Sequence, residues 1–259
     1  MSIDQFLFEV TAHYRSRGFP DSALFHLRWT LLSNVNFDTG CFCLKTAYPR
    51  CTKSIKELLG LFQPIHDADL DKDQEATAVF GFAFGYRMDE WLDGIHPKDE
   101  LETRFRRRPG KNNEALAEIA ERINRDLKLP LYLQFEIADA VTNKDAVKFS
   151  SSRKDQNTIA VAKEFVDHTE KNVFGKRFVM LLAHKHHYER CRIVLKRMGV
   201  QIVPIPEKYP RYDKYDEHEA QPRVMSAEEN ILNDFASMAG MLGTRYEISH
   251  NNPINHTGE

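Results

Sequence analysis

Beyond residue 75 the sequence alternates between short apolar runs and longer segments with helical periodicity, and this alternation restricts the possible folds more than any other feature. The apolar runs predict four strands, at 76–84, 129–135, 177–184 and 200–205. The periodic segments predict helices at 112–127, 157–169 and 187–198. Because the runs are apolar at nearly every position, helices are expected on both faces of the sheet. The pattern therefore predicts an α/β, Rossmann-like three-layer fold with a parallel sheet.

The residues before this alternation predict a helical extension of the core. Apolar residues lie at helical spacing over 3–14, and a second helical pattern follows at 21–33. An acidic run at 67–75 then marks a boundary. We therefore expect three parts, which are an N-terminal helical extension (1–70), an α/β domain (71–245) and a flexible C-terminal tail (246–259).

The charge balance bears on the class of partner. The chain has 36 basic and 38 acidic side chains and a formal net charge of −2. A general nucleic-acid binder needs a basic surplus for phosphate contacts, so we expect no nucleic-acid partner. No apolar run approaches the roughly 20 residues that cross a bilayer, and the first residues lack a signal-peptide pattern. The four cysteines are too few and too irregular for a disulfide scaffold. Together these features predict a cytoplasmic protein without a membrane partner.

The segment that follows the run at 177–184 has the richest set of polar side chains. In open α/β sheets, ligands bind beyond the carboxyl ends of the strands, where His184, His187 and Arg190 fall. His187 and Arg190 are three residues apart on an expected helix, so both can face one anion. Exposed N–H groups in the first turn of that helix would add anion affinity. A surface-exposed basic helix start is the alternative. We expect no metal, because no HExxH-like spacing accompanies the histidines.

Other candidate ligand contacts follow the remaining strands. Gly81 and Phe82 belong to GFAFGYR, whose glycines let a ligand approach the backbone closely. Ser151, Asn157 and Thr158 offer hydroxyls and backbone donors that suit phosphate, carboxylate or ribose. A serine-rich loop with a helix N-cap would give the same pattern.

Two charged candidates complete the site. Glu136 comes one residue after an apolar strand, where an acid often binds ribose or acts as a general base, although a solvated acid is the alternative. Arg104 begins the basic loop 104–113, which can grip phosphate, although charge runs are usually solvated faces.

A polar, tyrosine-rich segment at 207–222 follows the last expected strand. It has no helical or alternating apolar pattern, and its Tyr209, Tyr212 and Tyr215 can lie against the planar face of a ligand. Loops of this length are usually either functional lids or disordered. We therefore expect a mobile cover over the site, with a plain connector as the alternative.

The segment VMLLAHKHHYERCRIVLKRMGVQIVPIP (179–206) resembles the YdcF/SanA-like family of domains of unknown function. The family pattern is an apolar strand, a short turn, H-x-x-R opening a helix, a glycine, and a strand ending in proline. This sequence matches it at four positions: His187, Arg190, Gly199 and Pro204.

The resemblance extends upstream over about 75–206. QNTIAVAKEF (156–165) is similar to the family's N-T-x-x-N-A helix start, with Val161 where asparagine is usual, and AVFGFAFG (78–85) is similar to its opening strand and turn. Leu101 and Arg104 suit the helix that follows in the family. The family's S-G-G after the second strand is absent. The resemblance implies a Rossmann-like fold, with S-adenosylmethionine binding in one branch and envelope roles in membrane-anchored relatives.

These observations favour a cytosolic YdcF-like enzyme, of transferase or hydrolase type, that acts on a nucleotide-type or otherwise anionic small molecule, with S-adenosylmethionine as one candidate. His187 would act as an acid or base, Arg190 would pair with carboxylate or phosphate, and Glu136 is the third catalytic candidate. A non-catalytic binding or regulatory module, whose N-terminal helices dock a partner or form a homodimer, is the second hypothesis. A metal-assisted hydrolase is the third, and the missing carboxylate ligands disfavour it.

Overall fold

The computed structural model describes residues 3–34, 41–42, 53–54, 75–88, 107–152, 157–170, 176–209, 212–215, 225–228, 230–232, 234–235 and 237. The chain divides into two compact units. Residues 66–226 form one of them, here called the α/β unit, and residues 1–65 together with 227–259 form the other, here called the hairpin unit. The sequence pattern places residues up to 245 in the α/β domain, whereas in the structure the segment from 227 onward belongs with the N-terminal helices.

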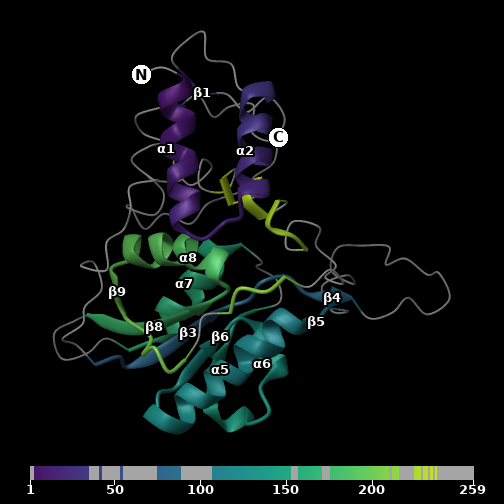
Figure 1. Ribbon diagram of the computed structural model, residues 1–259. Helices are drawn as coiled ribbons and strands as arrows, with labels where there is room; N and C mark the ends of the chain where they lie inside the picture. Colours follow the sequence, from purple (N-terminus) through teal and green to yellow (C-terminus); the bar gives the residue numbers. More distant parts are fainter. Residues whose placement is uncertain are drawn as a thin grey trace, which may run out of the picture. The chain divides into compact units, whose positions relative to one another are not determined.

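The α/β unit contains a five-stranded sheet in which every pairing is parallel (Figure 1). In chain order the strands are β3 (Ala78–Phe82), β6 (Leu131–Leu133), β7 (Val147–Ser150), β8 (Arg177–Ala183) and β9 (Val200–Val203). Across the sheet their order is β7-β6-β3-β8-β9, so the first strand in the chain lies at the centre. The four strands expected from the apolar runs are confirmed as β3, β6, β8 and β9.

Helices cover both faces of this sheet (Figure 1). One face is covered by α5 (Lys111–Leu127) and α6 (Phe135–Ala140), and the other by α7 (Thr158–His168) and α8 (Lys185–Arg197). A 3-10 turn, η3 (Lys144–Ala146), precedes β7, and a short antiparallel ribbon joins β4 (Arg87–Met88) to β5 (Arg107–Arg108). The expected Rossmann-like three-layer α/β fold is therefore confirmed.

Side chains of β3 alternate between the two helical layers, as a strand requires. Val79 and Ala83 belong to a core cluster with Leu116 and Ile123 of α5. Phe80 and Phe82 point to the opposite face, where their ring centroids lie 5.1 and 5.2 Å from the ring of Phe165 in α7. Both faces of the central strand are thus packed with apolar groups, which explains its continuous apolar sequence.

Two elements differ from the sequence expectation. The apolar run at 129–135 is a strand only to Leu133, because α6 begins at Phe135. Glu136 therefore lies in the first turn of a helix and not in a loop. At the sheet edge, β7 forms from the sequence VKFS, whose side chains alternate between partly buried and exposed, so no apolar run announces it.

The hairpin unit is built on α1 (Ile3–Ser16) and α2 (Asp21–Asn34), which pack against each other, and it includes the short antiparallel pair β1 (Cys41–Phe42) and β2 (Lys53–Ser54). Gly18, at φ +80°, lies in the turn between the two helices, where its positive φ suits glycine. Among the described helices, none combines the length and apolar character that a bilayer crossing requires.

Helical residues within 227–237 are tied to this hairpin. The Asp234 carboxylate accepts a hydrogen bond from the Tyr14 hydroxyl at 3.2 Å and pairs with the Arg17 guanidinium at 2.6 Å. The Ser22 hydroxyl donates to Glu228 Oε1 at 2.5 Å. These contacts explain why the C-terminal segment groups with the first two helices.

Candidate functional site

The order in which successive strands are added to the sheet reverses at β3. From β3 the chain adds β6 and β7 on one side, and it then crosses to the other side to add β8 and β9. Such a reversal leaves a crevice at the carboxyl ends of the two strands that flank it, and ligands of open α/β sheets bind there. In this chain the flanking segments are residues 83–87 after β3 and the start of α8 after β8.

Two amide side chains hold the loop after β3 in place. Gln134 Oε1 accepts a hydrogen bond from Ala83 N at 3.0 Å. Asn113, in the first turn of α5, accepts from Phe84 N at 2.9 Å through Oδ1 and donates to Gly85 O at 2.8 Å through Nδ2. Asn113 is fully buried. The loop is therefore held in place at the reversal point, because its backbone groups are satisfied by side chains from two other elements.

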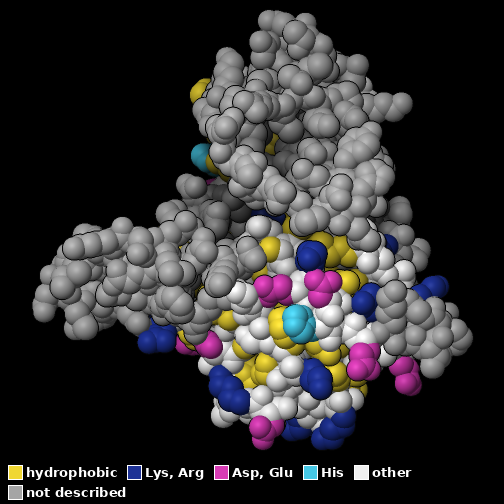
Figure 2. All heavy atoms as spheres, turned by 180° about the vertical axis from the view of Figure 1, so that it is seen from behind, with side chains coloured by type: hydrophobic (Ala, Val, Ile, Leu, Met, Phe, Trp, Pro, Cys, Tyr) yellow, Lys and Arg dark blue, Asp and Glu magenta, His cyan; other side chains and the backbone are white. Residues whose placement is uncertain are grey.

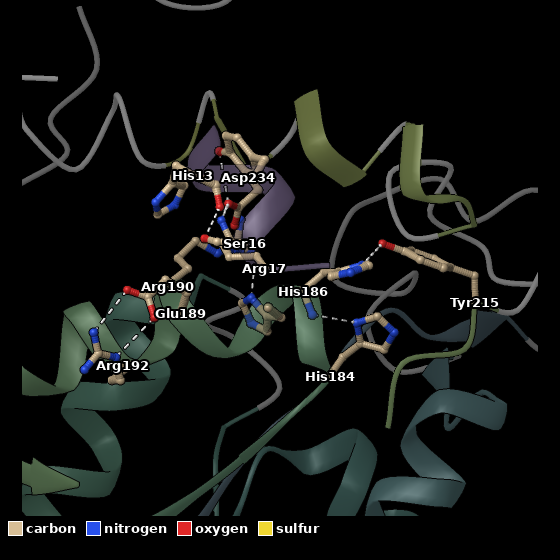
Figure 3. A network of polar contacts seen from close by, with 12 residues as sticks. His13, Ser16, Arg17, His184, His186, Glu189, Arg190, Arg192, Tyr215 and Asp234 are labelled. Atoms are coloured by element: carbon tan, nitrogen blue, oxygen red, sulfur yellow. Dashed lines mark hydrogen bonds and ion pairs between the residues drawn. The ribbon is translucent and has the colours of Figure 1, made fainter. Parts of the chain in front are cut away.

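His184 closes the carboxyl end of β8 and caps α8. Its Nδ1 accepts a hydrogen bond from His186 N at 3.3 Å (Figure 3), and its Nε2 lies 3.0 Å from Lys214 O. A ring that accepts at Nδ1 and donates to a carbonyl at Nε2 is the neutral Nε2–H tautomer. Complete burial, followed by the nearby His186, lowers the pKa of the His184 imidazole from 6.5 to about 3.

The His184 ring also forms a parallel stack with Phe84. Their centroids are 3.9 Å apart and their planes differ by 4°. This stack bridges the carboxyl ends of β3 and β8, which are the two strands at the reversal. Tyr212 and Tyr215 meet the same imidazole edge-on, at centroid distances of 6.0 and 5.1 Å. Aromatic rings thus line the reversal point. Phe84 is one of them, and no sequence pattern indicates it as a site residue.

Residues 212–215, here called the 212–215 segment, dock on the start of α8. Tyr212 O accepts from Lys185 N at 2.8 Å, and the Tyr215 hydroxyl lies 2.6 Å from His186 Nδ1 (Figure 3). Lys185 and Asp213 add an ion pair at 3.9 Å. These contacts place the 212–215 segment against the start of α8, and a mobile cover over a ligand site stays a prediction. Residues 210–211 and 216–222 lie outside the described residues.

The first N–H groups of α8 have partners within the protein. Lys185 N donates to Tyr212 O, and His186 N donates to the His184 ring. His187 N and Tyr188 N both donate to His184 O. The expectation that exposed N–H groups of this turn attract an anion is therefore wrong for this conformation, because the chain itself satisfies them. Anion affinity at this position must come from side chains.

His187 and Arg190 form a pair on α8, as their spacing predicts. Arg190 Nη2 donates to His187 Nδ1 at 2.9 Å. His187 is 5% exposed, whereas Arg190 is partly exposed. Since Nδ1 accepts this bond, the proton of the neutral His187 ring is on Nε2. The buried imidazole therefore orients the partly exposed guanidinium near the carboxyl end of β8. A second pair on α8 joins Arg192 to the Glu189 carboxylate through two nitrogens, at 3.1 and 3.2 Å (Figure 3).

Ser151, Asn157 and Thr158 follow β7. Ser151 is buried, and its hydroxyl accepts from Phe135 N at 3.2 Å, which fixes the start of α6. Asn157 is the N-cap of α7, where its Oδ1 accepts from Ala160 N at 2.8 Å, and Thr158 is the first helical residue. These contacts match the alternative of a serine-containing loop with a helix cap. Ligand contacts by the three residues stay a prediction.

Gly81 and Phe82 lie inside β3, and their neighbours are apolar side chains. A Cβ at Gly81 would lie 2.5 Å from Leu133 Cδ2 and 3.4 Å from Ile137 Cδ1. The missing side chain therefore admits Leu133, which is a packing reason for glycine. Phe82 is fully buried against Phe165.

Three further candidates remain, which are Glu136, Tyr209 and Arg104. Glu136 is 1% exposed at the carboxyl end of β6, so the solvated alternative is wrong. Tyr209 was expected to face the ligand, but it belongs to the core cluster on the α5 face, and its hydroxyl donates to Asp126 at 2.8 Å. Arg104 lies outside the described residues.

The charge pattern of the surface agrees with the balanced composition. On the face shown in Figure 2, acidic and basic side chains are interspersed over the described part, and neither sign gathers into a large patch. No group of three or more His, Cys, Asp or Glu side chains within the described ranges is arranged to hold a metal ion. His184 and His186 instead bond to the 212–215 segment.

Comparisons of the chain with family models, with curated proteins and with solved structures found no match. The resemblance to the YdcF/SanA-like family therefore stays a prediction from the sequence motifs.

Proposed function

We propose that this chain is a cytosolic YdcF-like protein that binds a nucleotide-type, anionic small molecule at the carboxyl ends of β3 and β8. The observation that carries the proposal is the His187–Arg190 pair on α8, next to the stacked rings of Phe84 and His184. A cation held by a buried imidazole is suited to an anionic group, and flanking rings are suited to a planar one. The cytosolic location rests on the sequence alone.

Arg190 is the residue best suited to recognise the anion. Its planar guanidinium presents donors in a fork that matches carboxylate or phosphate. His187 fixes one of these donors at 2.9 Å, so less side-chain entropy is lost when Arg190 binds an anion. A rigid, partly exposed arginine in a Rossmann-like crevice is therefore a reasonable anion site.

S-adenosylmethionine fits this set of groups as one candidate. Its carboxylate suits the Arg190 guanidinium, and its adenine suits the rings around His184, especially those of Tyr212 and Tyr215. When bound, it would supply a transferable methyl group. In an enzyme of transferase or hydrolase type, His187 would act as an acid or base, with Glu136 as a second.

Calorimetric titration with S-adenosylmethionine, AMP and uncharged adenosine tests the proposal. We expect AMP or S-adenosylmethionine to bind more tightly than adenosine. Replacing Arg190→Ala or His187→Ala should weaken binding of the anionic probe by about tenfold to a hundredfold, the effect of losing a charge-assisted hydrogen bond. Arg190→Ala should also remove the preference for AMP over adenosine, because that preference depends on the cation.

Arg125→Ala is the matched control. Arg125 is an exposed arginine in the last turn of α5, at the edge of the sheet opposite the crevice, so its loss should leave affinity unchanged. Unchanged affinity in both site variants, or no binding of any probe, would contradict the proposal.

A non-catalytic binding module is the second candidate, and one observation favours it. The start of α8 is satisfied by the 212–215 segment, so the chain itself occupies the backbone donors that an enzyme of this fold would offer to substrate. Mass spectrometry of the bound ligand after long incubation separates the two: recovery of the unchanged ligand indicates a binding module, and a modified ligand indicates an enzyme.

A further inference from the structure

Helix α2 is apolar on two opposite sides. On one side its side chains are buried, at Ala23, Leu24, Leu27 and Leu31. On the other side Phe25, Trp29 and Leu32 are 70%, 64% and 47% exposed. Their spacing of four and three residues places them on a single face, here called the α2 face. Large exposed apolar side chains gathered on one face mark an interaction surface.

The apolar surface continues onto α1. Phe8 is 71% exposed. It lines a hollow of about 410 Å³ whose other walls are Thr11, Ala12, Arg15 and Ser16 of α1 and Arg28 of α2. The three exposed aromatic side chains leave roughly 400 Å² of apolar area to be covered, given that each buries about 150–250 Å² when enclosed. This is about half of the ~800 Å² that each partner contributes to a standard interface.

Charges of opposite sign lie on the two sides of Phe25. Asp21 is exposed at the start of α2, where Arg15 of α1 pairs with it at 3.0 Å, and the adjacent Ser22 hydroxyl donates to the carboxylate of Glu228. The two carboxylates and one guanidinium leave this end net negative. Arg28 lies three residues after Phe25 and forms no ion pair with a described residue. The α2 face is therefore acidic before Phe25 and basic after it.

We propose that the α2 face binds the α2 face of a second copy of this chain, antiparallel about a two-fold axis near Phe25. This arrangement places Arg28 beside the acidic end of the partner helix, where the partner's Asp21 lies, and it does so twice by symmetry. It also sets Phe25 against Phe25 of the other copy, and it places Trp29 over the first residues of the partner helix. A surface that carries its own complement in charge and in apolar area fits an isologous dimer better than an unrelated partner.

Sedimentation equilibrium of the full chain over a range of concentrations tests the dimer. We expect a monomer–dimer equilibrium for the native chain. Phe25→Asp and Trp29→Glu should each weaken association by about 30-fold or more, as loss of a central aromatic contact does. Leu127→Glu is the control, because Leu127 is an exposed apolar residue on α5 and should not affect association. Circular dichroism confirms that the variants stay folded.

Charge reversal tests the antiparallel register. Arg28→Asp and Asp21→Arg should each weaken the dimer about tenfold, because two symmetry-related pairs become repulsive. The double variant, Asp21→Arg with Arg28→Asp, should restore association, since each pair is reversed in both copies. A native chain that is monomeric at every concentration would overturn the dimer. The α2 face would then be covered by another segment of the chain or by another protein. Failure of the double variant to restore association would overturn the register.

Discussion

At the scale of single residues, His184 joins the carboxyl ends of β3 and β8 to the start of α8. Its imidazole caps α8 through Nδ1, bonds to Lys214 O through Nε2 and stacks on Phe84. The sequence marks His184 as a ligand contact because it follows a strand. In the structure it is completely buried, so its first role is to join β3, α8 and the 212–215 segment.

The pKa of His184 makes stability depend on pH. In the folded chain this pKa is lowered from 6.5 to about 3, chiefly by burial and then by His186. Between these pH values the unfolded chain binds the proton and the folded chain does not. The contribution of His184 is therefore fully present above pH 6.5 and is lost as pH falls toward about 3, at up to ~1.4 kcal/mol per pH unit.

His184→Gln isolates this contribution, because the amide can still accept from His186 N and donate to Lys214 O. We expect the free energy of unfolding of the variant to fall less steeply with acidification than that of the native chain. Urea unfolding at several pH values measures both slopes. The same slope in the two proteins would mean that His184 titrates in the folded state as it does in the unfolded one.

At the scale of elements, the long apolar strands and periodic helices could be predicted, and short or edge elements could not. β8 and α8 follow from RFVMLLA and the helical pattern that ends at Gly199, whose φ of +78° suits the residue after a helix. β7 lies at an edge with half-exposed side chains, and α6 has six residues that continue an apolar run. Neither has the length from which a period can be recognised.

The same reason limits the prediction of the site. Local spacing places His187 and Arg190 together, because residues three positions apart on one helix share a face. The docking of Tyr215 on His186 and the hold of Asn113 on the loop after β3 join residues 29 and 28 positions apart. No local pattern encodes those contacts, since they depend on how the elements pack.

The docked 212–215 segment leads to a prediction about its opening. Tyr215→Phe removes the hydroxyl that bonds to His186 Nδ1, and a bond of this kind contributes about 1 kcal/mol, or roughly a fivefold change in the open population. Trypsin should then cleave after Lys214 about five times faster, because cleavage follows the open population when closing is fast. Mass spectrometry of the fragments measures the rate at this one bond.

Tyr209→Phe is the matched control in the same stretch of chain. Its hydroxyl bonds to Asp126 at the end of α5 and not to α8, so cleavage after Lys214 should keep its native rate. A native rate in Tyr215→Phe as well would show that the hydroxyl does not hold the segment. Protection of the bond by a saturating anionic ligand would further support a cover over the site.

At the scale of the whole molecule, a segment late in the sequence packs with the first two helices. The helical residues from 227 onward belong to the same unit as α1 and α2, although the α/β unit, residues 66–226, separates them in the sequence. The sequence could not indicate this, because the contacts that tie Asp234 to Tyr14 and Arg17 span 220 and 217 residues. An apolar stripe shows that a helix needs a partner, but not which one.

The Arg17–Asp234 pair gives the last prediction, because it is a buried ion pair between the residue that follows α1 and the C-terminal segment of the hairpin unit. The Arg17 and Asp234 side chains are 9% and 1% exposed, and their charged atoms lie 2.6 Å apart. Removing one member of a buried pair costs about 3–5 kcal/mol, so Asp234→Asn should strongly destabilise this unit. Hydrogen exchange of α1 and α2 measures the loss of protection. Arg15→Ala breaks the exposed Arg15–Asp21 pair, at 64% and 87% exposure, and should cost less than about 1 kcal/mol. If the two variants lost protection equally, the buried pair would not be what holds the end of the chain to its beginning.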